Sequence, residues 1–279
     1  MKEEHRKEFT HLKIHSQYSI CEGALRINDL AKYCKENKIK AIGLNDSFNL
    51  CGALEFSEEI SKTGTQPIIG SQINFKFHDT LGKLPVYAKT EKGFQNLTKL
   101  SSKSYLEIEE NTVPHCEIED LLKNGDDLIV LSGGIDSLFS NLIKKNNIKY
   151  LDEITKKLQE TFKDRFYFEI QRHNDLGEKN IENIFLNMSK KFKVPLIASQ
   201  EVFYISPDMY EAHDALLCIG EKTYVDEKNR KKFSNQHYIK TQEEMEKLYN
   251  DLPEAMENNY NFHERFSYKL KKSKPDLPS

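Results

Sequence analysis

Short apolar runs alternate with amphipathic segments along most of the 279-residue chain. Short buried strands separated by helices of about 10–15 residues are typical of βαβ units and a mainly parallel sheet. About seven such strands in one domain favour a closed barrel over an open sheet. We therefore expect an α/β fold built as a distorted seven-stranded (β/α) barrel. The predicted strands are 10–15, 41–44, 67–73, 84–88, 127–131, 166–170 and 195–199.

The predicted helices lie between these strands. The first follows Asn28, a possible N-cap, and carries Leu30, Ala31 and Cys34 on one face. The second stops at Gly64, because glycine suits the left-handed position that ends many helices. The remaining helices are expected at 93–105, 135–145, 151–162, 178–192, 207–219, 241–250 and 253–265.

The charge balance limits the classes of partner. Lys and Arg number 41 and Asp and Glu number 44, so the net charge is -3. A chain with this balance has no excess of basic residues with which to bind the phosphates of nucleic acid, so we expect little direct DNA binding. The five cysteines form no CxxC pair, which predicts a reduced, cytoplasmic protein. No apolar run approaches the roughly 18–20 residues of a membrane span, so no membrane partner is expected.

Polar side chains follow the predicted strands, at the edge where parallel barrels collect their chemistry. His15, Glu22, Asp46 and Glu201 could donate lone pairs to a metal, and His173 could be a fifth donor. The set is thin and has no tight motif spacing. The structural alternative, that these residues satisfy hydrogen bonds at strand ends, is favoured.

Several segments, in this order, resemble the PHP domain at the start of bacterial DNA polymerase III alpha subunits. The most specific are GFQNL (93–97) and the pattern D-x-x-N-L-x-G-A-x-x-F within LNDSFNLCGALEF (44–56). The others lie at 9–19, 22–24, 67–72, 128–134, 164–170, 195–204, 212–219 and 252–259. The resemblance covers nearly the whole chain.

This resemblance implies a barrel of the PHP type over residues 1–270, with 271–279 starting a linker. It also implies that polymerase domains belong to the same longer chain and that those domains use Mg²⁺. The proofreading exonuclease subunit is a further candidate partner. Active PHP domains are metal-dependent phosphoesterases, and the resemblance supplies nine positions at which they hold ligands. In this chain the nine are Lys13, His15, Glu22, Ser47, Gln72, Lys83, Gly134, Glu201 and Phe203.

Only His15, Glu22 and Glu201 among these nine offer a ligand-type side chain. Lys13 and Lys83 bring ammonium groups, which have no lone pair and repel a cation. We therefore predict a vestigial pocket with no metal, no cofactor and no catalytic residue. We also hypothesise that the Lys13 ammonium is paired with Glu22 or Glu201, since a buried lysine without a partner is costly.

Two classes of function remain open. The first is a non-catalytic structural and partner-docking module of DNA polymerase III, whose parent protein is a DNA-directed DNA polymerase. The second is a residual metal-dependent phosphoesterase or proofreading exonuclease. A free-standing histidinol-phosphatase-like protein is a weaker third. For the remaining candidates, we expect structural roles for His11 and His213, a tight turn at 132–134, and a solvated loop for the basic run 228–232.

Overall fold

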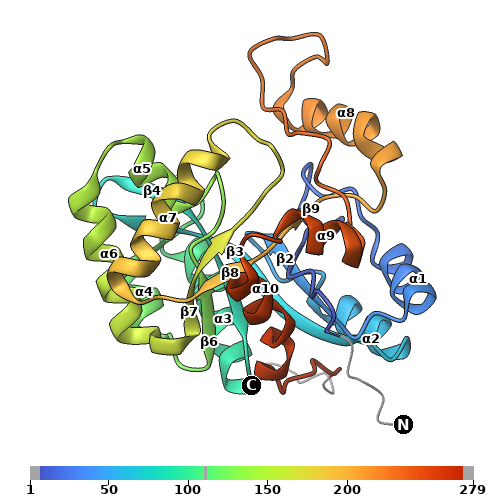
Figure 1. Ribbon diagram of the computed structural model, residues 1–279, viewed down its shortest axis with the longest axis horizontal. Coiled ribbons are helices and arrows are strands. Elements are labelled where there is room, and N and C mark those ends of the chain that lie inside the picture. The colour runs from blue at the N-terminus through green and yellow to red at the C-terminus, as the bar shows by residue number, and fades with distance from the viewer. Residues whose placement is uncertain (1–6, 110–111, 273–279) are drawn as a thin grey trace.

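The computed structural model describes residues 7–109 and 112–272 (Figure 1). The last seven residues of the expected linker, 273–279, lie outside the described residues. The strands are β1 (Lys13–Ile14), β2 (Ala41–Ser47), β3 (Gln66–Phe77), β4 (Thr80–Ala88), β5 (Cys116–Glu117), β6 (Leu128–Leu131), β7 (Phe166–Ile170), β8 (Leu196–Ala198) and β9 (Glu201–Val202).

The strands form one curled sheet in the order β8-β7-β6-β4-β3-β2-β1-β9, with β5 paired to β3 at the side. β8 pairs with β7 at one end and β9 pairs with β1 at the other. Only Ser199 and Gln200 separate β8 from β9, so the chain itself joins the two ends of the sheet. With β8 and β9 taken as one interrupted strand, the ring has the seven strands that the sequence predicts. β4 runs antiparallel to both neighbours, which the expectation of a mainly parallel sheet did not include.

Helices cover the outside of the curled sheet (Figure 1). α2 packs on β3, α3 and α5 pack on β4, and α7 packs on β7. The helices are α1 (Ile27–Asn37), α2 (Ala53–Lys62), α3 (Glu91–Leu106), α4 (Ile118–Lys123), α5 (Leu138–Lys144), α6 (Ile148–Phe162), α7 (Glu178–Phe192), α8 (Tyr210–Glu221), α9 (Gln242–Leu248) and α10 (Pro253–Tyr260).

The predicted end of the second helix is confirmed, and the predicted start of the first is not. Gly64 follows the end of α2 with φ 87°, the left-handed conformation expected there. The predicted N-cap Asn28 is wrong, because α1 begins at Ile27 and Arg26 takes the cap position. No side chain caps this end, and burial of Leu30, Ala31 and Cys34 against the sheet stabilises the helix instead.

The two ends of the barrel interior differ in polarity. At one end Tyr87, Tyr167, Phe262 and Phe266 fill the space with aromatic rings. At the other end the inward positions are polar, and they include Lys13 on β1. The sheet therefore has an apolar plug at one end and buried charge where the strands finish.

α8 and the segment after it stand out from the barrel (Figure 1). The return segment comes back to the barrel at Phe203, whose backbone nitrogen donates to the carbonyl of His237 at 2.9 Å. Among the described helices, none is long and apolar enough to cross a membrane.

We expect Tyr249→Phe to destabilise the closure of the barrel. The fully buried hydroxyl of Tyr249 lies 2.9 Å from the carbonyl oxygens of both Ile170 and Ser199, so it bridges β7 and the end of β8. Its loss leaves these carbonyls without that donor and should cost about 1–3 kcal/mol in urea unfolding. Tyr224→Phe, at a side chain that is 78% exposed, is the control and should change stability by less than about 0.5 kcal/mol. Equal effects of the two variants would contradict this account.

Candidate functional site

The nine positions of the predicted vestigial pocket come together at the ends of the strands. Seven of them line one small pocket: Lys13, Glu22, Gln72, Lys83, Gly134, Glu201 and Phe203. The other two touch it directly, because His15 bonds to Glu201 and Ser47 bonds to Glu22. The fold therefore brings all nine positions together in one place.

Lys13 lies at the base of this pocket between two carboxylates. Its Nζ is 3.3 Å from Glu201 Oε1 and 3.7 Å from Glu169 Oε1. Lys13 and Glu201 are direct partners in the register of β1 and β9. Burial raises the pKa of the Glu201 carboxyl, but Lys13, His15 and Lys83 outweigh it and hold that pKa well below its usual range. The hypothesis of a Lys13–carboxylate pair is confirmed for Glu201, and Glu22 has other partners.

Glu22 is held by two other lysines. Its Oε1 lies 3.2 Å from Lys83 Nζ and 3.5 Å from Lys231 Nζ, and the Ser47 hydroxyl donates to its second oxygen. Burial raises the pKa of this carboxyl, but Lys83, His15 and Lys231, together with the Ser47 hydrogen bond, lower it to about 2. Lys83 thus neutralises Glu22 as Lys13 neutralises Glu201.

His15 is enclosed by hydrogen bonds. Its Nε2 lies 3.0 Å from Glu201 Oε1 and 2.9 Å from Gln72 Nε2, and its Nδ1 lies 3.2 Å from Ser19 Oγ. The Phe203 ring packs on it with centroids 4.7 Å apart. The one imidazole among the nine positions is therefore occupied on both nitrogens and one face.

The remaining positions fill the pocket. A Cβ on Gly134 would lie 1.9 Å from Gln171 Oε1, so the Gln171 side chain takes the space beside this glycine. Phe203 stacks on Phe233 at 4.9 Å. The free volume left between these groups is about 10 Å³, roughly room for one water molecule.

These residues do not fit the metal cluster that active PHP domains carry. The ammonium groups of Lys13 and Lys83 lie against the carboxylates that a metal would need. Asp46 cannot replace them, because it accepts hydrogen bonds from Ser16 and Ser19. A metal-bound hydroxide needs an open coordination position, and the packed side chains leave no room for one.

Ser19, His15 and Glu201 stand in the order of a nucleophilic triad, which the sequence did not indicate. The Ser19 hydroxyl, however, donates to Asp46 Oδ1 at 2.7 Å and is therefore not available to His15 as a proton donor. Ser19 is also only 1% exposed. A nucleophile must reach its substrate, so this line of residues is structural.

A second group of ligand-type side chains lies beside the pocket. His173, Asp175 and His237 place ligand atoms within 4.8 Å of one another. The two rings are parallel at 4.0 Å, so their lone pairs do not converge, and every ring nitrogen already has a partner. His173 binds Glu178 and the backbone nitrogen of Glu201, and His237 binds Asp175 and the carbonyl of Glu201. The expectation that His173 is a satisfied polar residue is confirmed.

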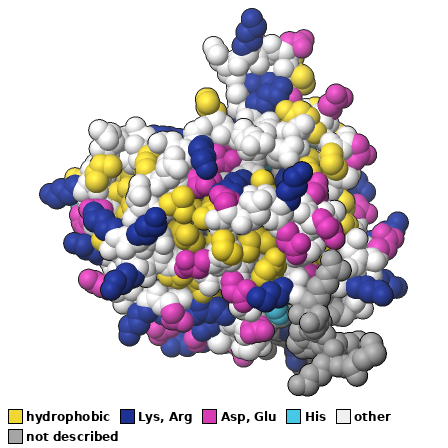
Figure 2. Space-filling view, in the orientation of Figure 1, with side chains coloured by type: hydrophobic (Ala, Val, Ile, Leu, Met, Phe, Trp, Pro, Cys, Tyr) yellow, Lys and Arg dark blue, Asp and Glu magenta, His cyan; other side chains and the backbone are white. Residues whose placement is uncertain are grey.

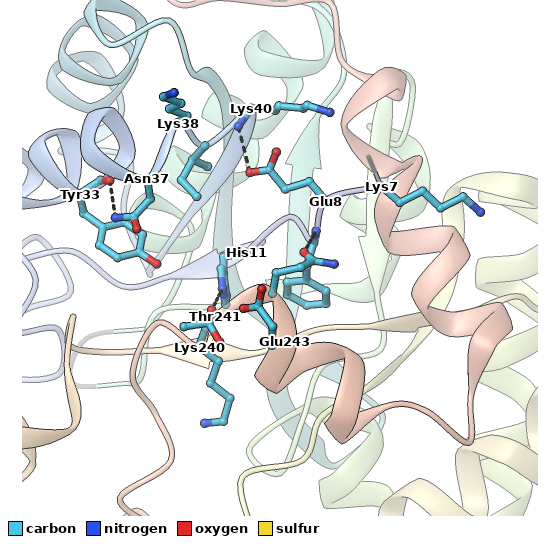
Figure 3. Close-up of a pocket in the computed structure, with 13 residues that line it drawn as sticks. Lys7, Glu8, His11, Tyr33, Asn37, Lys38, Lys40, Lys240, Thr241 and Glu243 are labelled. Atoms are coloured by element: carbon cyan, nitrogen blue, oxygen red, sulfur yellow. Dashed lines mark hydrogen bonds between the residues drawn. The ribbon is translucent and has the colours of Figure 1, made fainter. Parts of the chain in front are cut away.

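A cavity of about 430 Å³ lies away from the pocket (Figure 3). It borders residues that precede β1 and β2, so it is at the opposite ends of these strands. Figure 3 shows the Glu8 carboxylate beside the backbone nitrogen of Lys40, which donates a hydrogen bond of 3.3 Å to Glu8 Oε1. His11 lines the cavity and bonds through Nε2 to the carbonyl of Lys240 at 2.9 Å, as expected for a structural histidine.

Two further expectations on local structure have definite outcomes. The turn at 132–134 is tight, as predicted, with Gly133 at φ 77°. The basic run 228–232 is not simply a solvated loop. Arg230 makes a two-pronged ion pair with Asp214, with both N–O distances 2.6 Å, and Lys231 reaches Glu22.

The residues that contact the nine positions and were missed at the sequence level include Glu169, Gln171 and Lys231. Glu169 has a signal, because it is the single charged residue in the otherwise apolar strand 166–170. Gln171 has none, since only the fold places its side chain beside Gly134. Lys231 lies in a basic run, and nothing in that run indicates that the chain returns to the barrel there.

Comparison with known proteins identifies the family. The PHP domain family matches residues 11–173, more than half of the chain. The chain belongs to the PHP domain family. Of the nine ligand positions that the resemblance supplies, His15, Glu22 and Glu201 carry a ligand-type side chain in this chain.

The most similar curated relatives include subunits of a replicative polymerase. The chain is 36% identical over 275 residues to the DNA polymerase III subunit alpha of Rickettsia conorii, covering 98% of this chain and 23% of that protein. It is 35% identical over 279 residues to that of Caulobacter vibrioides, covering 97% and 24%. The chain thus spans about a quarter of the length of these relatives.

Among solved structures, an amidohydrolase from Chromobacterium violaceum matches at a TM-score of 0.48 and 9% identity, covering 75% of this chain and 96% of that one. This likeness is too low to bear on the chemistry.

We expect Glu22→Gln to remove much of the pH dependence of the free energy of unfolding in the acid range. The folded pKa of Glu22 lies below its usual value of 4.5, so its contribution is fully present above pH 4.5 and is lost as pH falls towards about 2. The variant should be on the order of 3 kcal/mol less stable at neutral pH, and the two curves should converge near pH 2. Denaturant unfolding across pH 2–7 measures this. A constant difference at every pH would refute the assignment.

We expect Lys13→Met to be strongly destabilising. Methionine keeps the apolar stem but leaves Glu169 and Glu201 buried without their counter-ion, which should cost about 3–5 kcal/mol at pH 7. Lys62→Met removes an ion pair with Glu59 from a lysine side chain that is 66% exposed, and should cost less than about 1 kcal/mol. Similar unfolding midpoints for the two variants would show that the buried pair is not a stabilising element.

Proposed function

We propose that this chain is the PHP domain of a DNA polymerase III alpha subunit and acts there as a non-catalytic structural and docking module. Its relatives at 35–36% identity are such subunits over nearly all of this chain. Three quarters of each relative lies beyond the matched part, and the polymerase chemistry, with its Mg²⁺, belongs to that remainder. Replication in the cytoplasm is the corresponding setting.

The observation that carries the non-catalytic role is the pair of lysine–carboxylate contacts in the pocket. The Lys13 and Lys83 ammonium groups lie 3.3 and 3.2 Å from Glu201 and Glu22. They supply the positive charge that metal ions supply in active members, and they offer no Lewis acidity and no bound hydroxide. The domain keeps the charge balance of the site without its chemistry.

Direct DNA binding is not the proposed role of this domain. Figure 2 shows lysine and arginine mixed with aspartate and glutamate over the face it presents, without a basic stripe. The net charge of -3 agrees with this. We propose that its partners are protein surfaces, namely the polymerase domains of the same chain and the proofreading exonuclease subunit.

Elemental mass spectrometry of the purified domain, before and after dialysis against Zn²⁺ and Mn²⁺, tests the non-catalytic role. We expect less than about one tightly held ion per chain and no hydrolysis of a 3′-mismatched primer, since the multi-metal chemistry needs more than one ion. Metal-dependent hydrolysis that His15→Ala abolishes would establish the alternative, a residual phosphoesterase or exonuclease.

The docking role has a separate test. The polymerase subunit that contains this domain should retain the exonuclease subunit in a pull-down, and a subunit lacking residues 1–270 should lose it. Full retention without the domain would remove docking from the proposal while leaving the absence of catalysis untouched.

A further inference from the structure

The cavity between the end of α1 and the start of α9 has the size of a small-molecule site. Its volume is about 430 Å³, and pockets that hold small ligands measure roughly 300–1,000 Å³. Its walls come from residues 7–11, 33–40 and 240–243 (Figure 3). Of the described residues that line it, none is among the nine positions of the vestigial pocket, so it is a separate candidate site.

Acidic and hydroxyl groups face this cavity. Figure 3 shows the Tyr33 hydroxyl and the Glu8 carboxylate turned towards the space between the lining residues. The hydrogen bond from the Lys40 backbone nitrogen to Glu8 Oε1, at 3.3 Å, holds this carboxylate at the wall. Glu243 adds a second carboxylate to the lining. These groups suit a ligand that brings hydrogen-bond donors and positive charge.

The electrostatic field at the Tyr33 hydroxyl is negative. Burial raises the pKa of this hydroxyl, and the Glu244 and Glu8 carboxylates are among the groups that raise it further. α1 also ends at the cavity, with Lys38 as its C-cap residue, and the C-terminal end of a helix carries a partial negative charge. Both effects stabilise a cation in this place.

The lysines that line the cavity contribute their aliphatic stems to it. Figure 3 shows the amino groups of four lysines directed away from the enclosed space, namely those of Lys7, Lys38, Lys40 and Lys240. Lys7 Nζ pairs with Glu257, and Lys240 Nζ donates to the carbonyl of Gln236 at 2.5 Å. Long side chains of this kind cover apolar surface with their methylene groups while the charge stays outside. The positive charge of these lysines therefore lies around the cavity and not within it.

His11 adds an unpartnered acceptor to the wall. Its side chain is 6% exposed, and Nε2 lies 2.9 Å from the carbonyl oxygen of Lys240, so Nε2 carries the proton of the neutral ring. Nδ1 then presents a lone pair, and it has no hydrogen-bond partner among the residues that the structure describes. A buried polar atom without a partner is costly, and an N–H donor bound beside His11 supplies the missing hydrogen bond.

We propose that this cavity binds an organic cation, in which a guanidinium or ammonium group is carried on an alkyl chain. The Glu8 carboxylate and the Tyr33 hydroxyl accept hydrogen bonds from the cation, and the apolar side chains of Phe9 and Ile39 line the cavity beside the chain. The Tyr33 ring adds an aromatic face, which attracts cations. A free amine and an arginine or lysine side chain of a partner protein offer this same chemistry. The site lies at the opposite ends of the strands from the vestigial pocket, and the proposal does not depend on the non-catalytic role.

Titration of the 279-residue protein with three matched probes tests the charge of the ligand. Butylguanidinium carries the proposed cation, butylurea has a similar shape and N–H donors without the charge, and pentanoate carries the opposite charge. We expect butylguanidinium to bind at least about tenfold more tightly than butylurea, because hydrogen bonds from a charged donor to a carboxylate are stronger, and we expect no binding of pentanoate. No binding of butylguanidinium, equal affinity for butylurea, or a preference for pentanoate would overturn the proposal.

Two isosteric variants locate the site. Glu8→Gln keeps an oxygen for the Lys40 backbone nitrogen and removes the charge, so the affinity for butylguanidinium should fall at least about tenfold. Glu160→Gln makes the same change at an exposed position of α6 that does not line the cavity, and it should bind as the parent does. Amide NMR shifts on addition of butylguanidinium should concentrate at residues 8, 33 and 240–243. Unchanged affinity of Glu8→Gln, an equal loss in both variants, or shifts confined to other residues would refute the assignment.

A fourth probe separates the two sources of the cation. N-acetyl-arginine N-methylamide presents the guanidinium on a peptide unit. Binding at least as tight as that of butylguanidinium assigns the cavity to an arginine side chain of a partner protein, and weaker binding assigns it to a free amine. Failure of both probes would end the proposal and would leave the metal-content and pull-down experiments unaffected.

Discussion

The buried contact between Lys13 and its two carboxylates is the constraint around which the rest of this site is arranged. A charge enclosed in a barrel is tolerated only with a partner. Here Glu201 lies on β9, which pairs with β1, and Glu169 lies on β7, which pairs with β8. Neighbouring side chains supply further hydrogen bonds to these carboxylates. Gln72 donates to Glu201, and Gln171 donates to Glu169. His15 lies between Glu201 and Ser19 and contacts both. The polar end of the barrel is one continuous network.

The same network neutralises the acidic side chains of this PHP fold with groups of the chain itself. In an active member, metal ions neutralise the converging acidic side chains. In this chain, lysines from β1, from β4 and from the segment that follows α8 do so. Because each ammonium is tethered to the backbone, neutralisation is built into folding and does not depend on the supply of an ion. The cost is chemical: an ammonium cannot polarise a phosphate ester or activate water as a metal does.

The sequence predicted the barrel because the periodicity of its strands and helices is local and repeated. The nine pocket positions came from the resemblance to PHP domains, and the fold brings them together at one end of the barrel. The sequence could not predict Gln171 beside Gly134 or Lys231 above Glu22, since these contacts depend on how distant segments return to the barrel. The antiparallel direction of β4 was also missed, because a short apolar run does not indicate in which direction the strand runs relative to its neighbours. The Asn28 cap failed because burial of one helix face outweighed capping.

The interrupted strand β8–β9 has a further consequence. One stretch of backbone both completes the ring and carries Glu201, so closure of the barrel fixes the position of this carboxylate. An engineer who wished to build a metal site into this domain would find a carboxylate already placed by the backbone. The task would be confined to exchanging side chains and clearing the rings and amides that now occupy the space, which makes the domain a prepared scaffold for redesign.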